Sequence, residues 1–165
     1  MRLLFDAIRA LIYSTGFIFF WGYTALWVRR YDASLGISLP TWLLIPGISL
    51  MAIGAPIALA CVGTFVVRGR GTPAPFDAPR QLVAAGPYRW VRNPMYLGAG
   101  LIVVGYAFYV GSISVLILAA AMWITIHLFV YFYEEPTLRE KFNGSYENYC
   151  RVVSRWLPRP PPAAR

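Results

Sequence analysis

Charged residues are scarce in this chain. Of its 165 residues, only 13% are Asp, Glu, Lys or Arg, whereas 58% are hydrophobic. Soluble domains carry roughly 25% charged residues, so the deficit argues against a soluble globular protein and for an integral membrane protein. At this length we expect a single domain over residues 1–165.

Residue types that bind metals or form disulfides are also scarce. The chain has two cysteines, Cys61 and Cys150, and one histidine, His127. Cys61 falls in an apolar run and Cys150 in a polar tail, and the spacing of these residues is not that of a zinc or iron site. We therefore expect neither a disulfide nor a metal centre built by the protein.

The net charge of +8 does not indicate a nucleic-acid-binding protein. Basic residues gather near the N-terminus, between residues 68 and 92, and after residue 138, which are the ends of the apolar runs. This placement is typical of the cytoplasmic flanks of membrane helices. We expect membrane lipids as partners, with the basic C-terminal residues facing anionic headgroups, and no nucleic acid.

Four apolar runs predict an all-α fold, a polytopic membrane bundle of about four transmembrane helices. The runs cover about residues 11–28, 41–67, 95–109 and 113–133. The second is long enough to cross a bilayer with tilt, whereas the third is short for a span. Gly111 and Ser112 separate the last two runs and predict a tight antiparallel hairpin.

Polar segments flank these runs. Residues 68–93 form a loop rich in Gly, Pro and Arg. Residues 134–156 alternate charged residues with aromatic ones, a pattern that predicts a C-terminal amphipathic helix at the membrane interface. We expect the tail at 158–165 to be disordered.

The arginines also predict the orientation of the bundle. If both termini and the 68–93 loop are cytoplasmic, only Arg29 and Arg30 of the 15 Lys and Arg residues lie on the other side. The hairpin then returns the chain to the cytoplasmic face beyond residue 133. The loop and the C-terminal segment are therefore predicted to share that face.

Two polar clusters on this face predict a small-molecule site. The segment Gly86–Gly100 places two arginines, two tyrosines, two prolines and three glycines at the start of an apolar run. Glu134-Glu135-Pro136 follows the hairpin. So many hydrogen-bonding groups at a membrane boundary indicate more than a linker.

These motifs, in this order, resemble those of the integral-membrane methyltransferases, which include isoprenylcysteine carboxyl methyltransferases and phospholipid N-methyltransferases. The resemblance rests on GPYRWVRNPMYLG, the hairpin, EEPTLREKF and YENYCRVVSRWLP, and it covers about residues 80–158 as a catalytic core. It implies S-adenosylmethionine (SAM) as methyl donor, held at the cytosolic end of the bundle. It also implies a lipidic or membrane-partitioning methyl acceptor.

The resemblance also implies roles for individual residues. Arg92-Asn93-Pro94 matches the family's arginine–histidine–proline motif, and Arg92 and Asn93 are the expected catalytic residues. The expected cofactor-binding residues are Gly86, Tyr88, Arg89, Asn93, Tyr96, Gly98, Gly100, Glu134 and Glu135.

The chemistry of SAM suits these residue types. Carboxylates accept hydrogen bonds from ribose hydroxyls or an ammonium and favour positive charge, and Arg89 or Arg92 can hold an acidic group. Gly98 and Gly100 would let the backbone approach a ligand closely. Each also has a purely structural explanation: helix packing for the glycines, membrane anchoring for the arginines, and first-turn helix acids for Glu134-Glu135.

Asn93 departs from the family pattern, because the family has histidine there. Asparagine donates and accepts hydrogen bonds but does not act as a base near neutral pH. This favours an acceptor that is already ionised, such as an isoprenylcysteine carboxylate, over the amine of a phospholipid. The sequence is also compatible with a non-enzymatic membrane scaffold or lipid-binding protein. A nicotinamide-dependent membrane reductase is disfavoured, because the chain has no motif for a second, phosphate-rich cofactor.

Two further positions need an explanation. Phe142-Asn143-Gly144 has asparagine where the family has glycine directly after the phenylalanine. His127 lies within a predicted span, which marks it as a functional candidate. The competing interpretation is a neutral histidine that is hydrogen-bonded to a neighbouring helix.

Overall fold

The computed structural model describes residues 2–69 and 81–160 of the chain. This part is mainly helical, with one isolated β-bridge between Ser38 and Ser112 and no strand. The predicted all-α class is therefore confirmed. The helices are α1 (Arg2–Val28), α2 (Asp32–Leu35), α3 (Leu44–Thr64), α4 (Pro94–Val110), α5 (Ile113–Phe129) and α6 (Glu135–Val152).

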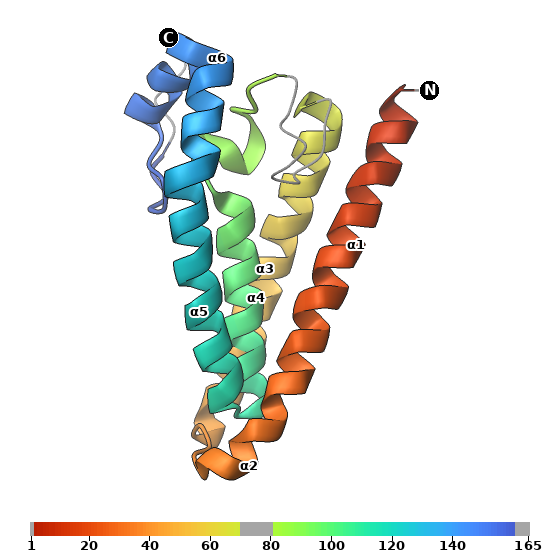
Figure 1. Cartoon of the computed structure of the whole chain (residues 1–165), viewed down its shortest axis with the longest axis vertical. Helices are drawn as coiled ribbons and strands as arrows, with labels where there is room; N and C mark the ends of the chain where they lie inside the picture. Colours follow the sequence, from red (N-terminus) through yellow and green to blue (C-terminus); the bar gives the residue numbers. More distant parts are fainter. Residues whose placement is uncertain (1, 70–80, 161–165) are drawn as a thin grey trace.

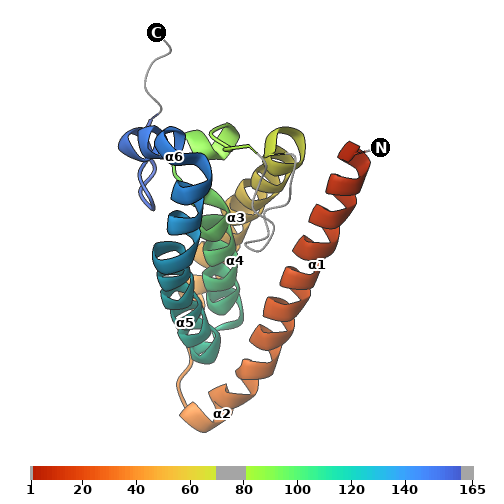
Figure 2. The same ribbon diagram turned by 45° about the horizontal axis from the view of Figure 1, so that its top comes forward.

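The long helices form a bundle with its polar segments at one end. α3, α4 and α5 run side by side, while α1 leans away from them toward its N-terminus (Figure 1). Both described chain ends and α6 lie at one end of the bundle, and α2 and the α4–α5 turn lie at the other (Figures 1 and 2). The two predicted polar clusters thus share one end.

Within the described residues, three helical segments are long and apolar enough to cross a membrane: Leu11–Leu35, Thr41–Val67 and Ile113–Val152. The apolar helix α4 is shorter, with 17 residues. These lengths confirm a polytopic membrane bundle, while a count of four spans stays a prediction.

Glycines set the close contact between α3 and α4. Gly47 and Gly54 lie one above the other on α3, and Gly98 and Gly105 do so on α4. A Cβ atom on Gly54 would lie 2.6 Å from the Gly98 carbonyl oxygen, and one on Gly105 would lie 2.7 Å from the Gly47 carbonyl oxygen. Small residues at such a crossing let the two backbones touch. The contact fixes the start of α4 relative to the end of α3.

The α4–α5 turn forms the predicted hairpin. Gly111 ends α4 with a φ of 66°, a left-handed conformation that glycine adopts without steric cost. Ser112 caps α5, since its side-chain oxygen accepts a hydrogen bond from the Val115 N–H at 3.2 Å. Asp32 adds a second cap by accepting from the Ser114 N–H at 2.9 Å. These bonds tie the α1–α2 corner to the hairpin.

α5 continues into α6 through one π-helical turn, Val130–Glu134. α6 then bends at Asn143, which has φ 45° and ψ −132°. The half of α6 beyond this bend turns across the end of the bundle (Figure 2). α6 buries Glu135 and Tyr146 and exposes most of its other side chains, as an interfacial helix does.

Residues 153–160 form a segment, here named the C-terminal strap, that packs back onto the loop before α4. The Arg92 N–H donates to the Ser154 carbonyl at 2.9 Å, and the Arg159 N–H donates to the Trp90 carbonyl at 2.9 Å. Arg159 belongs to the tail predicted to be disordered, of which residues 161–165 lie outside the described residues.

The conformation of Asn143 predicts a stabilising substitution. A positive φ at a residue other than glycine costs about 1–3 kcal/mol, so Asn143→Gly is expected to raise the free energy of unfolding by about 1 kcal/mol. Asn148→Gly is the matched control, because Asn148 lies within α6 without a positive φ; it is expected to lower stability by a similar amount. Thermal unfolding in detergent measures both. If the Asn143→Gly protein is less stable than the wild type, the backbone at Asn143 is not strained.

Candidate active site

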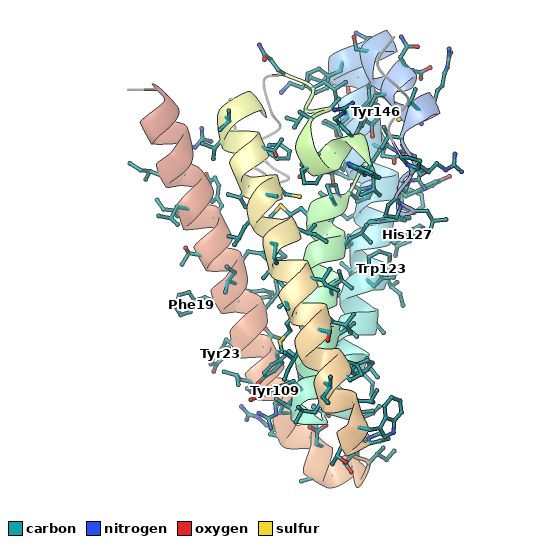
Figure 3. The ribbon with its side chains drawn as sticks, turned by 180° about the vertical axis from the view of Figure 1, so that it is seen from behind. Phe19, Tyr23, Tyr109, Trp123, His127 and Tyr146 are labelled. Atoms are coloured by element: carbon teal, nitrogen blue, oxygen red, sulfur yellow. The ribbon has the colours of Figure 1, made fainter. Side chains whose placement is uncertain are left out.

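A small pocket lies where the loop before α4 meets α6. Its cavity volume is about 60 Å³. It is lined by Phe65, Leu82, Val83, Tyr88, Arg92, Asn93, Glu134, Glu135, Leu138, Tyr146 and Tyr149. Tyr146 lies at this end of the bundle in Figure 3. The hairpin therefore brings together the two polar clusters, as predicted.

The loop before α4 is shaped by glycine, proline and a buried tyrosine. Gly86 has a φ of 56° and begins the 3-10 turn Gly86–Arg89, with Pro87 in its first turn. Tyr88 is buried, with its ring edge-on to Phe65 at 5.2 Å between centroids. Burial raises the pKa of the Tyr88 phenol well above its usual value, so this side chain stays neutral. Gly86 itself shapes the turn and does not line the pocket.

α6 holds this loop from the other side. The Tyr149 hydroxyl donates to the Tyr88 carbonyl oxygen at 2.7 Å. Arg92 donates through Nη1 to the Cys150 sulfur at 3.0 Å. Tyr146, Tyr149 and Cys150 share one face of α6 because they are spaced by three and four residues. The pocket is thus closed by a helix face whose residues the sequence analysis did not assign to the site.

Asn93 is buried at the start of α4, with 7% of its surface exposed. It is the residue before the first turn of α4, yet its side chain does not cap the helix. Its amide nitrogen instead donates to the Arg155 carbonyl oxygen in the C-terminal strap at 3.2 Å. One N–H of the amide is therefore engaged, and the side-chain oxygen is the acceptor that Asn93 offers to a ligand.

Glu135 is shared between two arginines. Arg155 donates through Nε to Oε1 at 2.7 Å and through Nη2 to Oε2 at 2.8 Å. Arg92 Nη1 lies 2.9 Å from the same Oε1. Glu135 is only 4% exposed, and hydrogen bonding to it raises the pKa of the Arg155 guanidinium. Both carboxylate oxygens of Glu135 are therefore occupied by protein donors.

Glu134 has a different environment. One of its oxygens, Oε2, accepts a hydrogen bond from the Tyr96 hydroxyl at 2.9 Å. It has no ion-pair partner among residues 2–69 and 81–160. Tyr96 does not itself line the pocket, but it orients this carboxylate. Of the two predicted acidic ligands, Glu134 is the one with capacity for a positively charged group.

Arg92 has a buried donor that is unpaired among the described residues. Its Nε is buried and makes no hydrogen bond within the described part of the chain. A buried donor without a partner costs about 1–3 kcal/mol, and Arg92 lines the pocket. A ligand oxygen there would remove this cost.

Besides Gly86 and Tyr96, three more predicted ligand residues lie outside the pocket. Gly98 is packed against α3 at the glycine crossing, and a Cβ on Gly100 would lie 3.9 Å from the Trp123 ring. Arg89 is exposed on the 3-10 turn. Helix packing accounts for Gly98, whereas a Cβ on Gly100 would make only an ordinary van der Waals contact. A direct cofactor contact stays a prediction for all three.

His127 is hydrogen-bonded to the C-terminal strap. Trp156 Nε1 donates to His127 Nδ1 at 3.1 Å, which agrees with a neutral, hydrogen-bonded histidine. The partner is the C-terminal strap rather than a neighbouring helix. His127 lies on α5 close to Trp123 (Figure 3), and neither His127 nor Trp156 lines the pocket.

The different environments of the two acidic residues predict different stability effects. Glu135→Gln leaves two arginines without their anion and is expected to lower the free energy of unfolding by roughly 2–3 kcal/mol. This is below the full cost of unpairing a buried charge, because Arg155 is 25% exposed. Glu134→Gln is expected to cost less than about 1 kcal/mol, since an amide oxygen still accepts from Tyr96. Denaturation in detergent measures both free energies of unfolding. Equal losses of stability in the two variants would contradict the different environments of Glu134 and Glu135.

Comparisons with known proteins identify the family to which the chain belongs. The phospholipid methyltransferase family model matches residues 42–145, a range that includes α3, the loop before α4, the hairpin and the first part of α6. The chain has no significant match among curated proteins or solved structures. Because the match covers well over half of the 165 residues, the protein belongs to the phospholipid methyltransferase family, membrane methyltransferases that act on lipid-type substrates.

Proposed function

We propose that the protein is a SAM-dependent membrane methyltransferase and that the pocket between the loop and α6 is its active site. The observation that carries the proposal is a set of polar atoms in one pocket that have no hydrogen-bond partner among the described residues: the second carboxylate oxygen of Glu134, the buried Arg92 Nε and the Asn93 side-chain oxygen. Two are acceptors and one is a cationic donor. This set complements a zwitterionic ligand.

These residues fit the amino-acid end of SAM. Arg92 would hold its carboxylate through Nε, as guanidinium groups bind carboxylates. Glu134 and the Asn93 oxygen would hold its ammonium or favour the positive charge on sulfur. When bound there, SAM supplies a methyl group on a sulfonium, a carbon that a nucleophile attacks in line.

The apolar residues around the pocket would exclude water. The apolar lining residues are Phe65, Leu82, Val83 and Leu138. The cavity of about 60 Å³ is smaller than the roughly 300–1,000 Å³ of small-molecule sites. We propose that the pocket widens to admit the ligand and that its closure aligns donor and acceptor away from solvent.

The acceptor is proposed to be a membrane-partitioning carboxylate of the isoprenylcysteine type. Such an acceptor is ionised at neutral pH and needs no base, which suits asparagine at position 93. SAM would enter from the cytoplasm, which we propose the pocket faces, together with both termini. The acceptor would enter laterally from the membrane.

The second candidate acceptor is the amine of a phospholipid. The name of the matched family favours it. An amine must lose a proton before or during transfer, and Glu134 is the carboxylate in the pocket without an ion-pair partner in the described part of the chain. With this acceptor, Glu134 would receive that proton.

Glu134→Gln is expected to weaken SAM binding about tenfold, because the lost interaction is a hydrogen bond to a charged group. Calorimetry on the purified full-length protein in detergent measures this. The control is Arg139→Gln, since Arg139 is 52% exposed and its ion pair with Glu147 is long, at 3.7 Å. The proposal is abandoned if the wild-type protein does not bind SAM at millimolar concentration.

The nature of the acceptor predicts the stability of the methylated product. After transfer of labelled methyl groups from SAM to a lipid extract, a carboxylate acceptor gives an ester, which releases volatile methanol in mild base. We expect this release. A labelled product that resists base would identify an N-methylated lipid and favour the second candidate.

A further inference from the structure

One residue of the C-terminal strap contacts both halves of the proposed active site. The Arg155 side chain binds Glu135 at the start of α6, and the Arg155 carbonyl oxygen binds Asn93 at the start of α4. Arg155 lies beyond residues 42–145, the range that the family model matches. It does not line the pocket, so any effect on a ligand acts through these two residues.

The side chain of Arg155 fixes the carboxylate plane of Glu135. Two parallel N–H···O bonds, at 2.7 and 2.8 Å, form the bidentate arrangement of arginine with carboxylate. The guanidinium also lies 5.3 Å from the centre of the Tyr131 ring, which limits its movement. Because Arg92 Nη1 binds the Oε1 atom that Arg155 also binds, the position of Glu135 sets that of Arg92.

The backbone of Arg155 selects the orientation of the Asn93 side chain. A carbonyl oxygen can only accept a hydrogen bond. The donating amide nitrogen of Asn93 therefore faces the Arg155 carbonyl in the strap. The Asn93 oxygen, which does not cap α4, is then the group left for a ligand donor. A flipped side chain would place its nitrogen toward the ligand instead.

The strap is anchored independently of these contacts. Trp156 donates to His127 and packs against Trp123, with ring centroids 4.7 Å apart. Both partners lie on α5 (Figure 3). Arg159 is bound to the carbonyl of Trp90. These anchors beyond Arg155 hold the strap against α5 and against the loop before α4.

We propose that Arg155 is a positioning residue of the active site, which aligns Arg92 through Glu135 and orients the oxygen of Asn93 toward the ligand. This inference rests on the proposed function, because it assigns Arg155 to the binding of SAM. It extends the site to a segment that follows the matched part of the chain.

The test compares three variants of the full-length protein in detergent by calorimetric titration with SAM and by thermal unfolding. Arg155→Gln removes the ion pair and is expected to weaken SAM binding about tenfold. Arg155→Lys keeps one charged contact and is expected to restore part of the affinity. Trp156→Phe removes the hydrogen bond to His127 but neither contact of Arg155. It is expected to lower the unfolding temperature while leaving the affinity for SAM within about twofold of wild type.

The outcomes separate this inference from the function on which it rests. Failure of the wild-type protein to bind SAM overturns the proposed function. Binding by the wild type together with unchanged affinity in Arg155→Gln overturns the role of Arg155 alone. An equal loss of affinity in Trp156→Phe also overturns it, since the strap would then act only through overall stability. If Arg155→Gln does not fold, Arg155→Lys decides: reduced affinity at an unchanged unfolding temperature supports the proposal, and wild-type affinity overturns it.

Discussion

The arrangement of the site depends on a single buried carboxylate, that of Glu135. It joins three segments that are distant in the sequence: the loop before α4 through Arg92, its own helix α6, and the C-terminal strap through Arg155. Burying an ionised carboxylate costs several kcal/mol unless its oxygens are paired, and here both oxygens carry charge-assisted bonds. The segments that meet at Glu135 therefore form one rigid frame around the pocket.

This frame gives two adjacent acidic residues different tasks. Glu135 neutralises arginines of the protein, whereas Glu134 is held by the Tyr96 hydroxyl and has no ion-pair partner within the described residues. Arg92 combines binding within the protein with capacity for a ligand. Its Nη1 binds Glu135, and its buried Nε has no partner in the part of the chain that the structure describes. A pocket that presents unused groups of both signs suits a ligand that is itself zwitterionic. This is the physical basis of the proposed SAM site in a family of membrane methyltransferases.

The helices below the site determine where it lies. The glycine contact between α3 and α4 brings two backbones together, and the capped hairpin returns α5 alongside α4. The loop before α4 and the start of α6 consequently emerge at the same end of the bundle (Figure 1). Glu134 and Glu135 lie within Ile113–Val152, a segment long and apolar enough to cross a membrane, and the largely exposed helix α6 begins at Glu135. We propose that the pocket lies near the boundary between the membrane and water. A water-soluble methyl donor and a lipidic acceptor can both reach such a position.

The amino-acid sequence by itself determined the membrane class, the helical segments, the hairpin at Gly111-Ser112 and the meeting of the loop with Glu134-Glu135. These follow from hydropathy, turn residues and helix length, which act locally along the chain. Only the tertiary structure decided which glycines serve packing, since a small residue on a helix suits a neighbouring helix as well as a ligand. It also separated Glu134 from Glu135, because successive helical residues point about 100° apart and only their surroundings show which one is paired. The role of Arg155 required the strap to fold back 20 residues onto Glu135, a long-range contact that no local pattern encodes.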